Sequence, residues 1–463
     1  MTPARQLARF VAGIRWQAVP GEVREKLLDH VLDTLGVICA GVGTPEGEAC
    51  AQVARGWGAG EQCTVVGHPW RLPAPGAVFL NAFHARIHTF DDTHAAGPLH
   101  PGCAALSAAL ACSELARLNG ERFLAAVLAG YETATRVSAA VSPSHYDRGF
   151  QNTGTCNSFA AAAAAGRAMG FEGDALLECL GLAAQSAAGL RQFQIDGSMV
   201  DTSFAGARAA LLGLVSAQLR AAGLPGAQGG LDGRWGFCNV TATDADLERL
   251  CSDLGERFEF AATALKPYPS CRFTHGPVEA VLRLRAEHGI DAADVEEVVI
   301  HAFQQSIELS DRPVVASAKD AILSHQYALA LALARGRVDL AGIAAHGAPD
   351  AIVAALMPRI RVIHDDALER LHPAHWPHRV TVRLRDGRLL TASSADPPGA
   401  HGRPLSRAAV AEKFLANAEP VLGREAAERA LAAVYALPQA PDLGRLTGSV
   451  SPRTSPSLRR RAS

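Results

Sequence analysis

One short polar run of the chain collects most of the side chains that could move a proton. Residues 89–102 read Thr-Phe-Asp-Asp-Thr-His-Ala-Ala-Gly-Pro-Leu-His-Pro-Gly and lie between two alanine-rich segments. The run brings two carboxylates, Asp91 and Asp92, together with the hydroxyl of Thr93 and the imidazole of His100. Groups that exchange protons are costly to gather, so such clusters are typical of functional sites. An acidic helix cap followed by a His-Pro turn would give the same pattern, and local sequence favours neither interpretation.

The segments around this run have helical periodicity. In residues 22–40, apolar side chains such as Leu28, Leu32 and Leu35 recur at three-to-four spacing. Small side chains let helix axes approach closely, so residues 1–265 are predicted to form a large all-α domain. Further helices are predicted for residues 102–118, 121–140, 157–169, 174–190 and 203–222, many of them rich in alanine.

A second type of pattern begins after residue 265. Residues 295–303 are typical of a strand, and residues 379–384 alternate before Asp386-Gly387, which is a strong hairpin signal. With helices expected near 275–288 and 318–335, the segment 266–395 is predicted to be a smaller α+β domain. Residues 404–434 return to helical periodicity, so the segment 396–440 is expected to complete the helical domain. The Ser-, Pro- and Arg-rich residues 447–463 are predicted to be disordered.

Charge and cysteine usage exclude several classes of protein. The chain has 463 residues and a net charge of −2, which becomes −6 without the four arginines after residue 450. Such a body has no broad electrostatic footprint for nucleic acid. The ten cysteines form no Cys-x-x-Cys pair, which argues against a zinc ribbon, an iron–sulfur run or a secreted disulfide scaffold.

The chain also lacks the signs of a membrane or exported protein. No apolar stretch is long enough to predict a membrane span. The first residues fit an amphipathic helix, with Leu7, Phe10 and Val11 at helical spacing and arginines between them. A cytoplasmic protein is therefore expected, and a transit peptide is the alternative.

A series of short motifs gives a resemblance over nearly the whole chain, and the chain is similar to the MmgE/PrpD family. This family includes 2-methylcitrate dehydratase, cis-aconitate decarboxylase and iminodisuccinate epimerase. The motifs are Asp33-Thr34-Leu35-Gly36, Asn81-Ala82, Phe90-Asp91-Asp92-Thr93-His94, His100-Pro101-Gly102, Gly130-Tyr131-Glu132, Gly149-Phe150, Thr153-Gly154-Thr155, Gly197-Ser198-Met199, Lys266-Pro267-Tyr268-Pro269-Ser270-Cys271 and His325-Gln326-Tyr327-Ala328.

The resemblance implies an architecture and a class of chemistry. It implies a helical domain with an α+β lid, an active site between them, a homodimer, no metal or other cofactor, and small carboxylic acids as substrates. It assigns Thr93 and His100 to the first loop, Lys266 and His275 to the substrate, and Tyr327 to the lid.

Other residues suit a carboxylate site, and each assignment has a structural alternative. Arg272 lies next to the matched residues, and its planar guanidinium suits a carboxylate. It could instead pair with an acid within the lid. Thr93 could cap a helix, His100 and His275 could be satisfied buried histidines, Lys266 could be a hinge lysine, and Tyr327 could be a core aromatic.

The chain departs from the family pattern at three places. Thr89 replaces the first aspartate of the usual Asp-Phe-Asp-Asp-Thr, and Gln151 replaces a histidine with an amide that does not titrate near neutral pH. Asp201 replaces a lysine after Gly197-Ser198-Met199. Thr89 and Gln151 are either inert or recruited replacements, and the set of groups for proton transfer is depleted.

The exchange of lysine for Asp201 reverses a charge where a carboxylate is expected to bind. Two like charges about 4 Å apart repel by roughly 4 kcal/mol at an effective dielectric of 20, which is about three orders of magnitude in binding. A substrate with fewer carboxylates, or with a cation, is therefore expected. Asp201 could equally be a solvated helix cap.

Three functions fit these residues. The first is a metal-independent dehydratase or decarboxylase type of lyase that abstracts a proton next to a carboxylate. The second is an isomerase or epimerase, which removes and returns a proton without a leaving group. The third is a catalytically weak member that binds a metabolite.

Overall fold

The computed structural model describes residues 1–198 and 200–452, which form two compact units. Among the described residues, the first unit contains Met1–Leu265 and those from Ser406 to residue 452, and the second contains Lys266–Leu405. The second unit extends past the predicted end at residue 395 because its own side chains hold the last segment. Arg403 binds Glu279 at 2.7 Å, and Arg272 donates to the carbonyl of Pro398 at 3.1 Å.

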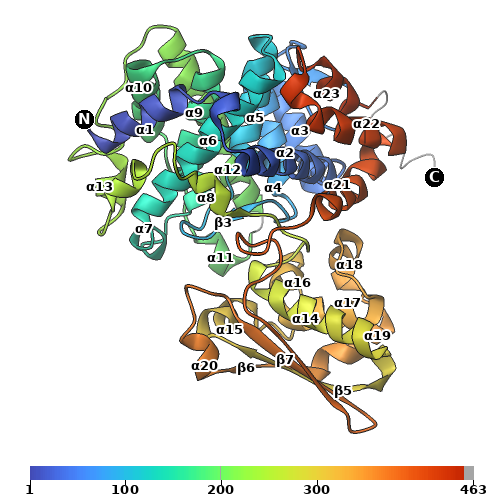
Figure 1. Cartoon of the computed structure of the whole chain (residues 1–463). Coiled ribbons are helices and arrows are strands. Elements are labelled where there is room, and N and C mark those ends of the chain that lie inside the picture. The colour runs from blue at the N-terminus through green and yellow to red at the C-terminus, as the bar shows by residue number, and fades with distance from the viewer. Residues whose placement is uncertain (199, 453–463) are drawn as a thin grey trace. The chain divides into compact units, whose positions relative to one another are not determined.

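The first unit is helical, as the sequence predicted (Figure 1). Its helices are α1 (Pro3–Ala12), α2 (Gly21–Gly41), α3 (Pro45–Gly56), α4 (Ala74–Arg86), α5 (Gly102–Leu115), α6 (Gly120–Val141), α7 (Ser144–Asp147), α8 (Asn152–Thr155), α9 (Asn157–Ala168), α10 (Gly173–Ala184), α11 (Phe193–Asp196), α12 (Val200–Ala221), α13 (Phe237–Thr241), α21 (Arg407–Leu422), α22 (Arg424–Tyr435) and α23 (Gly444–Ser449). Short strands pair as β1 (Cys63–Thr64) with β2 (Arg71–Leu72) and as β3 (Thr93–His94) with β4 (Thr263–Ala264).

Small side chains explain how these helices pack. Helix α9 lies at the centre of the unit against α5, α6 and α12, and Ala160, Ala163 and Ala165 are fully buried. At Gly130 of α6, an added Cβ would lie 2.9 Å from the Cβ of Ala105 on α5. The alanine- and glycine-rich composition therefore sets the close approach of the helices.

The C-terminal segment returns to the helical unit, as predicted, but it forms three helices, α21, α22 and α23, where one was predicted. Helix α21 packs along α2, where Phe414 lies against Gly36. The predicted helix 404–434 is two helices that meet at Gly423, which has φ of 82°. The predicted disordered segment 447–463 overlaps helix α23, and the carbonyl of Val450 accepts from the N–H of Gly67 at 2.8 Å. The prediction is wrong there because apolar side chains near residue 447 are buried; residues 453–463 lie outside the described residues.

The second unit is an α+β domain, in agreement with the predicted fold class. Its sheet has the order β6-β5-β7-β8, built from β5 (Val295–Ala302), β6 (Ile360–His364), β7 (His378–Leu384) and β8 (Leu389–Ser394). Strand β6 is parallel to β5, the other neighbours are antiparallel, and Val298 pairs with both Ile360 and Val382. The expected hairpin joins β7 to β8 through Gly387, which has φ of 88°.

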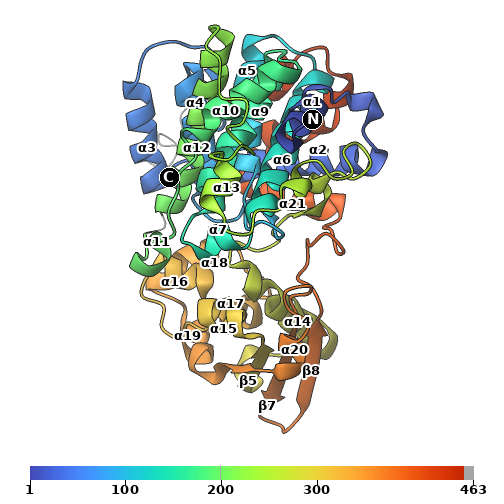
Figure 2. The same ribbon diagram turned by 90° about the vertical axis from the view of Figure 1, so that its left-hand side faces the viewer.

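Helices accompany this sheet. They are α14 (Arg272–His288), α15 (Gln304–Ser310), α16 (Ala318–Leu323), α17 (His325–Arg335), α18 (Leu340–Ala344), α19 (Ala351–Leu356) and α20 (Asp366–Glu369). Helix α14 packs on β7, β8 and α17 (Figure 2). The predicted helix 318–335 is interrupted at Ser324, whose hydroxyl caps the start of α17.

Two predicted properties of the whole chain can be compared with the structure. All ten cysteines are free, and nine of them are buried. Within the described residues, no single helix is both long enough and apolar enough to cross a membrane. Two pairs of consecutive helices meet these criteria of length and composition when the two helices of a pair are counted together, but each pair is sharply bent.

Candidate active site

The polar run identified in the sequence is the connection between α4 and α5 in the first unit. Its middle forms β3, which pairs antiparallel with β4, so that Thr93 lies opposite Ala264 and His94 opposite Thr263. The backbone of His94 also bonds that of Leu99 in both directions, at 2.8 and 3.3 Å. The loop is therefore held by main-chain bonds on both of its arms.

Asp91 is buried in this loop and is paired with a cation. Its Oδ1 accepts from Nη1 of Arg86 at 2.5 Å and lies 3.4 Å from Nδ1 of His100. Burial by itself raises the pKa of this carboxyl, but Arg86 and His100 outweigh burial and hold the pKa well below its usual range. Asp91 is therefore ionised.

Asp92 is also buried, but its partners are different. Its Oδ2 accepts from the hydroxyl of Tyr131 at 2.7 Å and lies 3.4 Å from Nδ1 of His30, while its Oδ1 accepts from the N–H of Gly102 at 3.2 Å. Burial, followed by the charge of Asp91, raises the pKa of Asp92 to about 6. Two adjacent carboxyls with separated pKa values are the arrangement used to divide acid and base roles.

His100 is the partly exposed member of the group. Its side chain is 19% exposed, compared with 1% for Asp91. Nδ1 lies 2.7 Å from the backbone carbonyl of Asp92, so this nitrogen carries the proton and donates it to that carbonyl. The lone pair is then on Nε2, which is the form needed for a general base.

Lys413 reaches the same loop from helix α21, in the C-terminal part of the chain. Its Nζ lies 2.6 Å from Oδ1 of Asp33 on α2, donates to the carbonyl of Phe90 at 2.9 Å, and lies 3.9 Å from the centre of the Phe90 ring. Burial raises the pKa of Asp33 to about 6, although Lys413 opposes this shift. Lys413 could not be predicted as a site residue, because no local signal in the sequence distinguishes it from a surface lysine.

Three other members of the cluster were also missed. His30 has no motif around it, and Arg86 precedes the loop without any distinctive spacing. Tyr131 stood in a family motif but was given no role. All three side chains are buried. The one signal that they share in the sequence is therefore a polar side chain on an otherwise apolar face of a helix.

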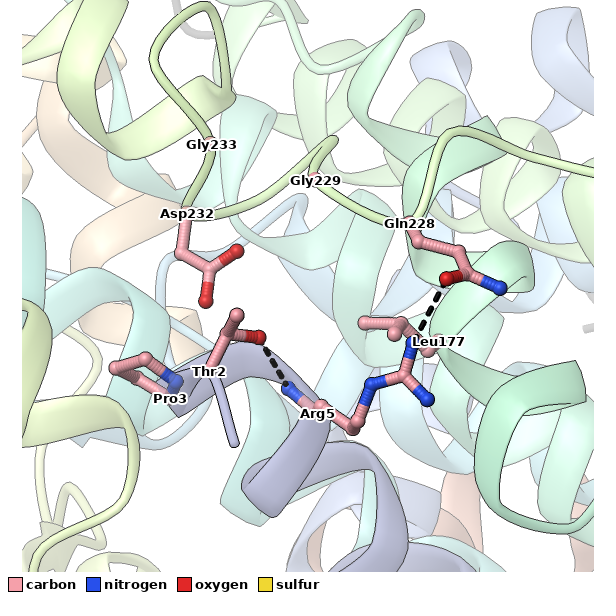
Figure 3. Close-up of a pocket in the computed structure, with 8 residues that line it drawn as sticks. All are labelled: Thr2, Pro3, Arg5, Leu177, Gln228, Gly229, Asp232 and Gly233. Carbon is pink, nitrogen blue, oxygen red and sulfur yellow. Dashed lines mark hydrogen bonds between the residues drawn. The ribbon is translucent and has the colours of Figure 1, made fainter.

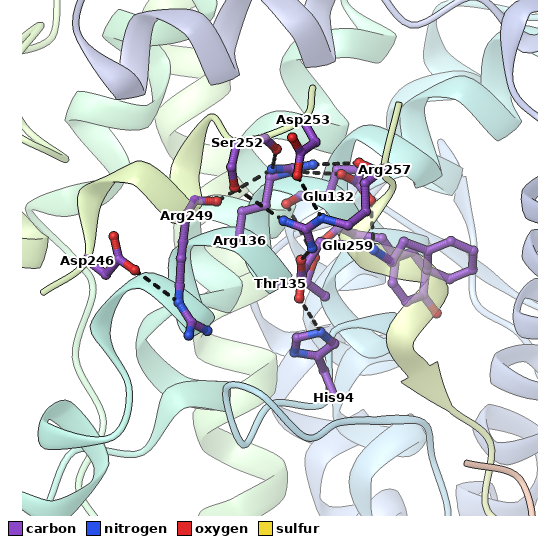
Figure 4. A network of polar contacts seen from close by, with 12 residues as sticks. His94, Glu132, Thr135, Arg136, Asp246, Arg249, Ser252, Asp253, Arg257 and Glu259 are labelled. Atoms are coloured by element: carbon purple, nitrogen blue, oxygen red, sulfur yellow. Dashed lines mark hydrogen bonds and ion pairs between the residues drawn. The ribbon is translucent and has the colours of Figure 1, made fainter. Parts of the chain in front are cut away.

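A second buried network anchors the loop through His94 (Figure 4). Glu132 on α6 accepts from Nε of Arg136 at 2.9 Å, and Arg136 donates to backbone carbonyls within residues 249–257. Just beyond this segment, Oε1 of Glu259 lies 3.3 Å from Nε2 of His94. The network thus joins α6, the segment before β4 and the loop.

The other predicted residues of the first unit are Thr93, Gln151, Asp201 and Thr89, and the structure places them as follows. Thr93 is half-buried in β3, and Gln151 is buried as the N-cap residue of α8. Asp201 is exposed in the first turn of α12, where a negative charge is favourable to the helix start. Thr89 has φ of 51°, a conformation unusual for a β-branched residue.

Three of the predicted residues of the second unit, Arg272, His275 and Tyr327, bond groups within that unit. Lys266 is its buried first residue. Arg272 donates to the carbonyl of Pro398, and Nε2 of His275 lies 3.2 Å from the carbonyl of Ser270. The hydroxyl of Tyr327 is fully buried and donates to the carbonyl of Gly342 at 2.8 Å, which is the structural role considered as its alternative.

A pocket of the first unit lies at the start of α1, away from the loop of residues 89–102 (Figure 3). It has a volume of about 290 Å³, and its cation is Arg5. That guanidinium donates to Asp174 at 2.6 Å and to Gln228 at 2.7 Å, so both of its terminal nitrogens already have partners within the protein. Across residues 1–198 and 200–452, no group of three or more His, Cys, Asp or Glu side chains is arranged to hold a metal ion.

Comparison with known proteins gives two family matches and several relatives. The MmgE/PrpD N-terminal domain matches residues 5–250, and the MmgE/PrpD C-terminal domain matches residues 268–439. The cis-aconitate decarboxylase-like protein oryM of Aspergillus oryzae is 25% identical over 96% of both chains. The cis-aconitate decarboxylase of Mus musculus is 26% identical over 95% of this chain and 91% of its own. That of Aspergillus terreus is 26% identical over 61% of this chain and 60% of its own.

Proposed function

Because the chain belongs to the MmgE/PrpD family, we propose that it is a lyase of the dehydratase or decarboxylase type that acts on a small carboxylic acid. The contact of His100 with the ionised carboxylate of Asp91 carries the proposal, since it supplies a base of fixed orientation in a partly exposed position. The relatives named cis-aconitate decarboxylase support the reaction class. Action without a metal is an expectation that comes from the family resemblance.

The chemistry follows from the orientation of His100. In a dehydration, Nε2 takes a proton from the carbon next to a carboxylate, and the hydroxyl group leaves from the neighbouring carbon as water after it is protonated. In a decarboxylation, carbon dioxide leaves first and His100, which must then begin in its protonated imidazolium form, gives a proton to the carbanion. In both cases Asp91 stabilises the imidazolium form of His100.

The proposed substrate has fewer carboxylates than the tricarboxylates used elsewhere in the family. The lysine usual in the family is replaced by Asp201, so one cation able to bind a carboxylate is missing wherever the Asp201 charge itself lies. Gln151 likewise replaces a histidine that could be charged. We propose that Lys266, Arg272 and His275 bind the remaining carboxylates.

The test is a panel of mono-, di- and tricarboxylic acids incubated with the protein in deuterated water. An unsaturated product or released carbon dioxide would support the lyase. His100→Gln should abolish turnover, while His288→Gln, an exposed histidine at the end of α14, should leave it unchanged. Turnover that survives His100→Gln would contradict the role of His100.

An isomerase or epimerase is the second candidate. The loss of titrating groups at Thr89, Gln151 and Asp201 favours it, because such a reaction needs no acid to assist a leaving group. Deuterium incorporated into otherwise unchanged substrate would identify this activity.

A further inference from the structure

A second pocket of the first unit lies where the segment after α1 meets the first turn of α6 and the last turn of α9. These three helices contact one another (Figure 1). The volume of the pocket is about 330 Å³, which falls in the range of small-molecule sites. None of its lining residues belongs to the loop of residues 89–102, so a ligand bound here would be separate from the substrate of the candidate active site.

The side chains of this pocket carry more positive than negative charge. Three arginines line it, Arg15, Arg122 and Arg167, and its one carboxylate is that of Glu121. Glu121 accepts a hydrogen bond from the side-chain amide of Gln17. Within residues 1–198 and 200–452, none of the three guanidinium groups lies within 4.0 Å of a carboxylate oxygen. Three positive charges and one negative charge leave an excess of two positive charges in the pocket.

Arg167 is held in place while its charge stays uncompensated. Its Nη2 donates to the backbone carbonyl of Ile14 at 2.9 Å, and its Nε is buried with no hydrogen-bond partner among the described residues. Burial, followed by repulsion from the charge of Arg122, lowers the pKa of Arg167. The guanidinium groups of Arg122 and Arg167 are therefore close enough to repel each other, and an anion bound between them would turn this repulsion into attraction.

The number of charges indicates the class of anion. A guanidinium group presents a planar fork of donors that fits a phosphate or a carboxylate. A phosphate monoester carries about two negative charges near neutral pH, so a single phosphate group balances the excess charge of the pocket. One carboxylate would balance only half of it. Arg15 and Arg122 are exposed, so the anion can enter from solvent.

We propose that this pocket binds the phosphate group of a small molecule, with Arg122 and Arg167 on the phosphate oxygens and Arg15 as the third positive charge. The binding site goes beyond the proposed lyase activity and does not rest on it, because none of the residues assigned to that activity lines the pocket.

Isothermal titration calorimetry of the intact protein with inorganic phosphate, at constant ionic strength, tests the proposal. The wild type should bind phosphate with a dissociation constant in the millimolar range or below. Arg122→Gln should weaken this binding by about tenfold or more, because it removes a charge-assisted hydrogen bond, and Arg122→Glu should abolish it. Arg429→Gln, which removes an exposed arginine on α22, is the control and should leave the dissociation constant unchanged.

The substitutions at position 122 carry the test because Arg122 is exposed and the bond from Arg167 to Ile14 stays intact in them. Failure of the wild type to bind phosphate, or equal binding by the wild type and Arg122→Glu, would overturn the proposal and would leave the three arginines as solvated surface charges.

Succinate distinguishes a phosphate site from a general site for dianions, because its two charges lie on separate carboxylates. The part of succinate binding that depends on Arg122 should be at least about tenfold weaker than phosphate binding. Equal strength of the two would overturn the assignment to phosphate. These titrations need no turnover, so their failure is distinguishable from failure of the lyase proposal.

Discussion

The ammonium group of Lys413 lies 2.6 Å from the carboxylate of Asp33, although the two residues come from opposite ends of the chain. The same group donates to the carbonyl of Phe90, immediately before Asp91 and Asp92. Helix α21 thus contributes a countercharge to Asp33 on α2 and a hydrogen bond to the candidate catalytic loop.

Lys413→Met should destabilise the first unit by about 3–5 kcal/mol, because it leaves Asp33 as an uncompensated buried charge. Adding Asp33→Asn should recover part of this loss, since the second change removes the charge. Chemical denaturation measures both effects. Arg429→Met, at an exposed ion pair on α22, is the control and should change stability by less than about 1 kcal/mol. If Lys413→Met and Arg429→Met changed the stability equally, Lys413 would not be the countercharge that stabilises buried Asp33.

The free energy of unfolding should decrease as the pH rises from about 4 to 6, because Asp92 ionises more readily in the unfolded chain than in the folded protein. Its folded-state pKa is raised from 3.8 to about 6, so the unfolded chain ionises first and the folded state retains the proton. About two pKa units correspond to roughly 3 kcal/mol lost across this window, and the loss is complete above it. Asp92→Asn should remove this part of the pH dependence in denaturation curves, whereas exposed Asp201→Asn should follow the wild type. If the stability of Asp92→Asn depended on pH in the same way as that of the wild type, the raised pKa of Asp92 would be contradicted.

Thr89→Asn should stabilise the protein by about 0.5–1 kcal/mol. Thr89 has φ of 51°, and asparagine tolerates this left-handed conformation better than a β-branched residue does. Thr89→Val keeps the branched side chain and should give no gain. Thermal unfolding of the three proteins measures the difference, and a valine variant as stable as the asparagine variant would argue against backbone strain.

Gly102→Ala should disrupt the surroundings of Asp92. An added Cβ would lie 2.6 Å from the hydroxyl oxygen of Tyr131, 2.8 Å from Oγ1 of Thr34 and 2.9 Å from Oδ2 of Asp92. Such crowding should cost about 1–3 kcal/mol in the free energy of unfolding, which chemical denaturation measures. Gly56→Ala, at the end of α3 with nothing within 4 Å of its added Cβ, is the matched control and should be neutral or stabilising.

The sequence by itself determined the fold class and the location of the polar loop. Helical periodicity such as that of Leu28, Leu32 and Leu35 survives in the structure because those side chains face one apolar core. The hairpin at Gly387 was predictable because its turn chemistry is local. Family motifs extended this to a reaction class, since they recur in a specific order.

Only the tertiary structure decided how the polar residues divide their work. Asp91 and Asp92 are identical and adjacent, yet one is paired with Arg86 and the other with Tyr131 and His30. Protonation depends on burial and on charges brought together by packing, which no local pattern encodes. Lys413 is 323 residues from Phe90, so its place in the cluster exists only once α21 has packed on α2.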